Sequence, residues 1–102
     1  MENMLTSKQR AALRGAANKM DTILQVGKDG INENLIQQVL DALAARELIK
    51  MRVLENAPLT SREAAFELAE ATDSESVQII GTRFVLYRRN KDKGQYDDIL
   101  KK

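Results

Sequence analysis

Residues 22–54 read TILQVGKDGINENLIQQVLDALAARELIKMRVL, and this order of patterns predicts a strand, a turn, a helix and a second strand. Apolar residues recur at spacings of three and four over residues 33–46, which is typical of a helix. The stretch 22–26 is short and rich in β-branched and apolar residues, which predicts a strand. Residues 48–54 alternate apolar and polar side chains, which predicts a second strand. A strand, a helix and a strand in succession indicate an α/β layer.

The flanking sequence adds two helices and two strands to this unit. Thr6 with Gln9 and Thr60 with Glu63 both have the spacing of a capping box, in which two polar side chains close the start of a helix. The added elements are a helix over residues 7–19, a helix from the cap at residue 60 to residue 71, a strand over 76–80 and a strand over 84–88, with residues 81–83 as a hairpin turn. The predicted fold is therefore α/β (α+β) and two-layered, with the order α-β-α-β-α-β-β and a four-stranded mixed sheet packed with three helices.

The composition argues against an enzyme. The chain has 102 residues, which suits one domain, and it contains no cysteine and no histidine. These absences remove disulfides, thiolate nucleophiles, the most frequent general base and the side chains that most often bind zinc. The phosphate-binding motif G-x-x-x-x-G-K-[ST] and the dinucleotide motif G-x-G-x-x-G are also missing from the sequence. We therefore expect no catalytic residue, metal, cofactor or small-molecule substrate.

Nothing in the sequence indicates a membrane or a secretory route. No apolar stretch approaches the roughly 18 residues of a membrane-spanning helix, and the first 19 residues lack the apolar core of a signal peptide. We expect a cytoplasmic monomer without membrane contact. Polarity rises from residue 90 onward, so residues 1–90 are the predicted domain and residues 91–102 a mobile polar tail.

The charges are unevenly distributed along the chain. In total, 16 basic and 15 acidic residues give a net charge of +1, yet residues 1–28 sum to +3, residues 29–75 to −6 and residues 76–102 to +4. If the fold brings the two ends together, one face becomes basic and attracts phosphate while another becomes acidic. Solvated charges scattered by chance are the alternative. In the second predicted strand, Lys50 and Arg52 alternate with apolar residues, which predicts one buried side and one partly basic side.

A glycine turn joins the first predicted strand to the helix that follows it. Gly27 and Gly30 enclose Lys28 and Asp29, and Asn32 is a good cap for the helix. Two glycines permit a tight turn and let a ligand approach the backbone closely. Unpaired N–H groups at the start of the helix, together with the Lys28 ammonium, suit a phosphate, as in the GxxG loop of KH modules. A plain strand-to-helix turn is the alternative interpretation.

Five segments in this order resemble the CRM domain (chloroplast RNA splicing and ribosome maturation), in its bacterial single-domain YhbY type. They are LTSKQR (5–10), VGKDGI (26–31), ELIKMRV (47–53), VQIIG (77–81) and VLYR (85–88). The resemblance covers about residues 4–90. It implies a fold similar to the C-terminal domain of translation initiation factor three, with an added N-terminal helix.

The resemblance also implies a function and a set of residues. Members of this family bind RNA; the bacterial form associates with precursors of the large ribosomal subunit, and plant relatives act in group II intron splicing. The implied RNA-binding residues are the GxxG loop of Gly27, Lys28, Asp29 and Gly30, the helix cations Lys8, Arg10 and Arg14, and Lys50, Arg52, Arg83 and Arg88. The chain departs from the expected pattern at residues 81–84, where a threonine, and not a cation, follows the glycine.

The sequence therefore supports two alternative functions. The first is an RNA-binding protein that acts in assembly of the large ribosomal subunit, with Arg10 and Arg14 on the same side as the glycine turn. Because the chain has only four aromatic residues, such recognition would rest on the RNA backbone and its shape. The alternative is a protein-interaction adaptor that docks basic ribosomal proteins through the acidic residues Glu63, Glu67 and Glu70.

Overall fold

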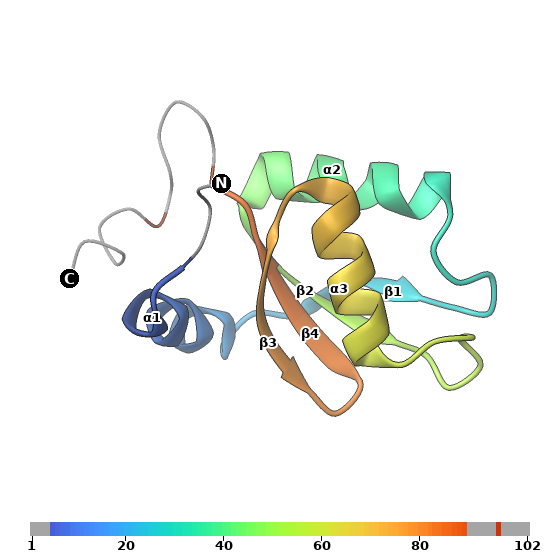
Figure 1. The fold of residues 1–102 in the computed structure, drawn as a ribbon, viewed down its shortest axis with the longest axis horizontal. Coiled ribbons are helices and arrows are strands. Elements are labelled where there is room, and N and C mark those ends of the chain that lie inside the picture. The colour runs from blue at the N-terminus through green and yellow to red at the C-terminus, as the bar shows by residue number, and fades with distance from the viewer. Residues whose placement is uncertain (1–4, 90–95, 97–102) are drawn as a thin grey trace.

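The computed structural model describes residues 5–89 and residue 96, which form three helices and one four-stranded sheet (Figure 1). The elements are α1 (Ser7–Ala17), β1 (Thr22–Val26), α2 (Glu33–Arg46), β2 (Leu48–Val53), α3 (Ser61–Thr72), β3 (Glu75–Ile80) and β4 (Arg83–Tyr87). This order and the mixed sheet confirm the predicted fold class. The predicted likeness to translation initiation factor three stays a prediction.

Several predicted boundaries shift by one or two residues, and two of these shifts affect the site residues or the turns. α1 ends at Ala17, two residues before the predicted end. Arg83 is the first residue of β4 and not part of the hairpin turn, because Gly81 takes a φ of +58° and completes the reversal with Thr82. A shorter turn places Arg83 on the surface of the sheet.

The strands lie in the order β1-β2-β4-β3, so β4 is inserted between β2 and β3. β1 and β2 are parallel and are joined through α2, whereas β4 is antiparallel to both of its neighbours. The N–H of Leu54 donates to the carbonyl of Val26 at 2.9 Å, and the N–H of Val53 donates to the carbonyl of Thr82 at 2.7 Å. The loops that follow β1 and β2 and the β3–β4 turn therefore meet at one end of the sheet.

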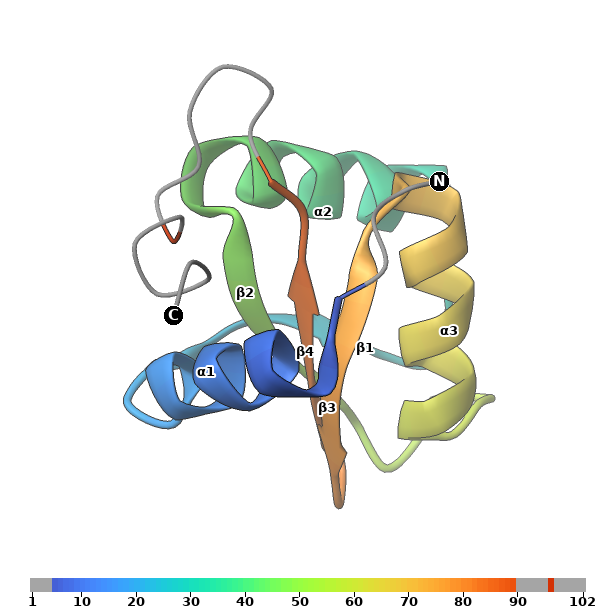
Figure 2. The same cartoon turned by 60° about the vertical axis from the view of Figure 1, so that its left-hand side comes forward.

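Helices cover both faces of the sheet (Figures 1 and 2). α2 and α3 pack on one face over the larger apolar cluster, and α1 packs on the other face over a smaller cluster. The larger cluster contains Val26, Leu35, Val39, Leu43, Ile49, Met51, Val53, Ala64, Ala65, Leu68, Phe84 and Leu86; the smaller contains Leu13, Ala17, Leu48, Val77, Val85 and Tyr87. The sheet and the helices α2 and α3 form the two predicted layers. α1 lies on the opposite face of the sheet, outside these two layers.

The helix starts follow the local sequence. Both predicted capping boxes form: the Thr6 hydroxyl accepts from the N–H of Gln9 at 3.0 Å, and the Thr60 hydroxyl accepts from that of Glu63 at 3.1 Å. The Asn32 side chain accepts from the N–H of Leu35 at 2.9 Å and caps α2. Short-range polar pairing thus sets where each helix begins.

The predicted tail, residues 91–102, lies outside the described residues apart from Tyr96. The ring of Tyr96 stands edge-on to that of Tyr87, with centroids 6.3 Å apart, and packs against the smaller cluster. Among the described residues, no helix is long and apolar enough to cross a membrane. The same part of the chain holds no group of three or more acidic side chains placed to bind a metal.

Candidate nucleic-acid interface

The glycine turn has one position that requires glycine. The N–H of Gly30 donates to the carbonyl of Gly27 at 2.9 Å, which closes the turn. Gly30 is buried and has a φ of +67°, in the region that side chains disfavour, whereas Gly27 has no positive φ. Lys28 and Asp29 at the tip are exposed. The turn, closed by this hydrogen bond, therefore presents its two central residues to solvent.

Backbone N–H groups are available at this turn. No hydrogen bond within residues 5–89 uses the N–H of Lys28, Asp29, Glu33 or Asn34. Such groups at the start of a helix suit an anion. The negative charges of the neighbouring Asp29 and Glu33 carboxylates repel an anion, however. The turn can therefore donate hydrogen bonds to an anion, but its charge does not attract one.

Lys50 and Arg52 lie on the face of the sheet that α1 covers, called here the α1 side. Residues directly opposite each other on neighbouring strands share a side. Lys50 is opposite Val85, which belongs to the smaller cluster, and Arg52 is opposite Arg83. The apolar residues that alternate with them are buried on the other face, so the partly basic side predicted for β2 is confirmed.

Arg52 and Arg83 face each other across β2 and β4, and we call them the arginine pair. Arg83 is exposed and Arg52 half-buried, and neither forms an ion pair within the part of the chain that the structure describes. Like charges directly opposite each other destabilise a sheet. A phosphate held between the two guanidinium groups would relieve this repulsion. Gln25 lies opposite Arg52 on β1, two residues before the glycine turn, so the arginine pair adjoins that turn.

The arginines of α1 lie elsewhere. The Arg10 guanidinium donates to the carbonyl oxygen of Ser76 and lies 3.6 Å from a carboxylate oxygen of Glu75. Both partners belong to β3, the edge strand opposite β1, and α1 and the glycine turn lie at opposite ends of the molecule in Figure 1. The expectation that Arg10 and Arg14 lie together with the turn is therefore wrong, because α1 and the turn are at opposite ends of the molecule. Arg10 fastens α1 to the sheet, and Arg14 follows one turn later on the same flank of the helix.

Lys8 and Arg88 also lie apart from the arginine pair. Lys8 is exposed on α1. Arg88 follows β4 at the end of the sheet opposite Arg83, where its backbone N–H donates to the carbonyl of Glu47 at 2.9 Å. Of the predicted residues, the structure thus brings together the glycine turn, Arg52 and Arg83, with Lys50 further along β2.

The fold separates basic from acidic residues. The α1 side carries the arginine pair and Lys50, and α1 itself has three basic residues and no acidic residue. The other layer is acidic: α2 and α3 carry Glu33, Asp41, Glu63, Glu67 and Glu70 against Arg46 and Arg62. The two sides thus differ in charge, but they do not follow the charge segments of the sequence, because Lys50 and Arg52 come from the segment that sums to −6 and Glu75 lies on the α1 side, opposite Tyr87.

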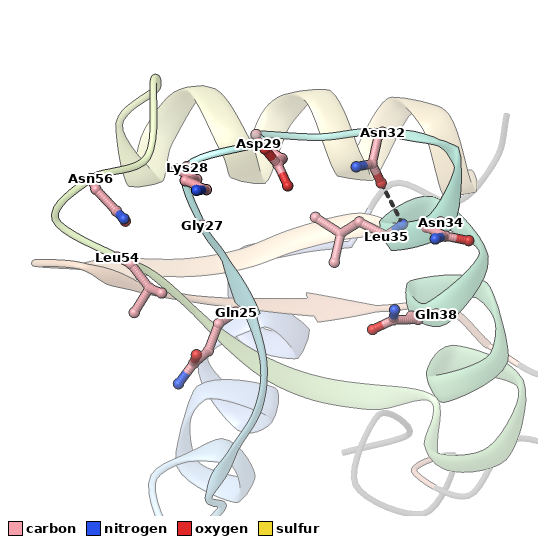
Figure 3. A pocket seen from close by; sticks show the side chains of 11 residues that line it. Gln25, Gly27, Lys28, Asp29, Asn32, Asn34, Leu35, Gln38, Leu54 and Asn56 are labelled. Carbon is pink, nitrogen blue, oxygen red and sulfur yellow. Dashed lines mark hydrogen bonds between the residues drawn. The ribbon is translucent and has the colours of Figure 1, made fainter.

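An open hollow of about 590 Å³ lies beside the glycine turn, and sequence reasoning did not find it. Its walls come from the end of β1, the turn, the first turns of α2 and the loop after β2 (Figure 3). Five lining residues carry side-chain amides: Gln25, Asn32, Asn34, Gln38 and Asn56. Because these residues come from separate segments of the chain, no local pattern could have grouped them.

Replacing Gly30 with alanine is expected to lower the free energy of unfolding by about 2 kcal/mol. An alanine there must keep a φ of +67° and would place its Cβ 3.1 Å from Cγ of Pro58. Gly27→Ala is the matched control, because its Cβ would meet only Leu54, at an ordinary 3.8 Å, and we expect a change within about 0.5 kcal/mol. Urea unfolding of both variants measures this, and equal losses would contradict the assignment of strain to Gly30.

Three comparisons with known proteins bear on this geometry. The family model for the CRS1/YhbY (CRM) domain matches residues 5–88. A Bacillus subtilis protein named as a probable RNA-binding protein, YqeI, is 44% identical over 92% of this chain and 98% of its own length. A Haemophilus influenzae protein named as RNA-binding is 30% identical over 86% of this chain and 89% of its own. The solution structure of a Staphylococcus aureus protein has a TM-score of 0.74 and 52% identity, over 87% of this chain and 93% of that one.

Proposed function

The chain belongs to the CRS1/YhbY (CRM) domain family, and from this premise we propose that it is a non-catalytic RNA-binding protein. Its relatives in Bacillus subtilis and Haemophilus influenzae are named for RNA binding and not for a reaction. The observation that carries the proposal in this chain is the arginine pair. Two guanidinium groups on adjacent strands, without a described acidic partner, offer bidentate contacts to backbone phosphates.

The RNA backbone follows the α1 side toward the glycine turn. Lys50, Arg52 and Arg83 supply cations along this path, and Lys28 supplies another at the turn. Unpaired N–H groups of the turn add hydrogen bonds to a phosphate. Since Arg10 is held by Glu75, we assign it to the attachment of α1 to the sheet and not to a phosphate contact.

The RNA is ribosomal RNA in precursors of the large subunit. This part of the proposal rests on the resemblance to the YhbY type. Sedimentation of a cell extract tests it: the protein should travel with immature large subunits and leave them after ribonuclease treatment.

RNA binding itself is tested by titration at several salt concentrations. Each phosphate contact releases bound counterions, so four cations predict a slope of log affinity against log salt of about −3 to −4. The affinity for structured ribosomal RNA should then fall by about 100-fold between 50 and 200 mM salt. Fluorescence anisotropy measures this, and an affinity that does not depend on salt would exclude the mechanism.

An adaptor function is the second candidate, because one observation favours it. Phe66 on α3 is 52% exposed among acidic residues, with the Arg62 guanidinium 5.7 Å from the ring centroid. An apolar ring beside Glu63, Glu67 and Glu70 suits a basic protein partner. Pull-down after nuclease treatment separates the two functions: partners lost with the RNA support RNA binding, and partners that remain support the adaptor.

A further inference from the structure

The hollow beside the glycine turn differs in chemistry from the arginine pair. Its lining includes one ammonium group, from Lys28, and one carboxylate, from Asp29, so its formal charge is zero. The Asp29 carboxylate points toward the hollow in Figure 3. A phosphate placed inside the hollow would gain little, because there the Asp29 carboxylate offsets the Lys28 ammonium. The hollow therefore suits a neutral, polar ligand.

The amides make the hollow suited to a flat group with hydrogen-bond donors and acceptors. Each amide offers two donors and a carbonyl acceptor. The Asn32 side-chain carbonyl caps α2, whereas the side chains of Gln25, Asn34, Gln38 and Asn56 make no hydrogen bond within residues 5–89. Five amides on three segments can thus meet a ligand from several directions. The volume of about 590 Å³ lies within the range of small-ligand sites.

Bases of unpaired RNA have the chemistry that fits. Asparagine and glutamine pair with base edges, bidentately with adenine, and a carboxylate accepts from the amino group of cytosine. No aromatic residue lines the hollow, so a base would be held by its edge and not by stacking. Its ribose and phosphate would lie toward the turn, where Lys28 stands.

We propose that this hollow binds the base of one unpaired nucleotide in the RNA, with Asn34 and Gln38 as its principal contacts from α2. The inference rests on the proposed function, because the RNA backbone on the arginine pair brings the nucleotide to the hollow. It adds base recognition to a surface that otherwise reads only phosphates. The protein should accordingly prefer RNA with an unpaired base at this point over RNA with an empty sugar there.

The test compares strands that differ only in their bases. The probes are single-stranded 12-mers of oligo-A, oligo-C and oligo-U and an abasic ribose-phosphate strand of equal length, measured by fluorescence anisotropy at fixed salt. We expect the best base-containing strand to bind about tenfold or more tightly than the abasic strand, as one amide–base pair allows. The variant Asn34→Ala with Gln38→Ala should lose this preference and keep the salt dependence.

Gln37→Ala is the matched control. Gln37 is the neighbour of Gln38 on α2, and its side chain donates to Asp41 at 3.0 Å outside the hollow. The control should keep the base preference, and circular dichroism should show that both variants retain the fold. Equal binding of abasic and base-containing strands, or a preference that survives in the double variant, overturns the inference and leaves the proposed function intact. Failure of every strand to bind also overturns the inference, and the titration with structured ribosomal RNA then tests the proposed function separately.

Discussion

Replacing Arg52 and Arg83 together with glutamate is expected to weaken RNA binding by about 100-fold at 100 mM salt. Each arginine is assigned one phosphate contact, and the loss of two contacts should also make the salt slope shallower by about two. Folding should be little affected, because two glutamates facing each other across β2 and β4 repel as the two arginines do. Anisotropy titrations at several salt concentrations measure both quantities.

A second double variant separates this local effect from overall charge. Arg46→Glu with Arg62→Glu changes the net charge equally but acts on α2 and α3, away from the α1 side. We expect its affinity to stay within about threefold of that of the original protein, because distant surface charges are screened by salt. If this variant loses as much affinity as the first, the arginine pair is not the contact and long-range attraction explains the binding.

Replacing Leu13 with alanine is expected to lower the free energy of unfolding by about 3 kcal/mol. Leu13 is fully buried, and with Ala17 it provides the buried contacts of α1 to the sheet. Removing a buried leucine costs both the burial of its side chain and the cavity that remains. Because the smaller cluster has only six buried members, few neighbours can close that cavity. Urea unfolding, followed by far-ultraviolet circular dichroism, measures the loss.

Ile80→Ala is the control for this experiment. Ile80 is an apolar side chain of similar size, but it is 60% exposed at the end of β3, and its removal should cost less than about 1 kcal/mol. The Leu13 variant should bind RNA normally at temperatures where it remains folded, since the arginine pair does not depend on contact with α1. A loss smaller than that of the control would show that α1 is not anchored by Leu13.

The arginine pair shows where sequence reasoning ends. The alternation in β2 predicts that Lys50 and Arg52 share a side, because the side chains of a strand alternate between two faces. The partner of Arg52 could not be predicted in the same way. Arg83 comes 31 residues later, and its position depends on the two-residue turn and on the insertion of β4 between β2 and β3.

The cations of α1 show the opposite outcome. Their helical spacing was predicted correctly, yet their place in the molecule was not. Arg10 and the turn are close in sequence, but α1 docks over the smaller cluster and directs Arg10 toward β3. The rotation of 100° per residue predicts which side chains share one face of a helix. It does not predict which element that face contacts, because this depends on packing between segments that are distant in the sequence.

The order of amino acids was enough to specify the seven elements, the helix starts at Thr6, Asn32 and Thr60, and the family. The elements and helix starts depend on residues a few positions apart, and the family is identified from short segments that follow one another in a fixed order. All of this can be read along the chain without knowing its contacts in space. Folding in three dimensions was needed to bring two arginines together beside the glycine turn and to line one hollow with five amides. Both arrangements depend on strand order and register, which are set by the burial of apolar side chains contributed from the whole chain.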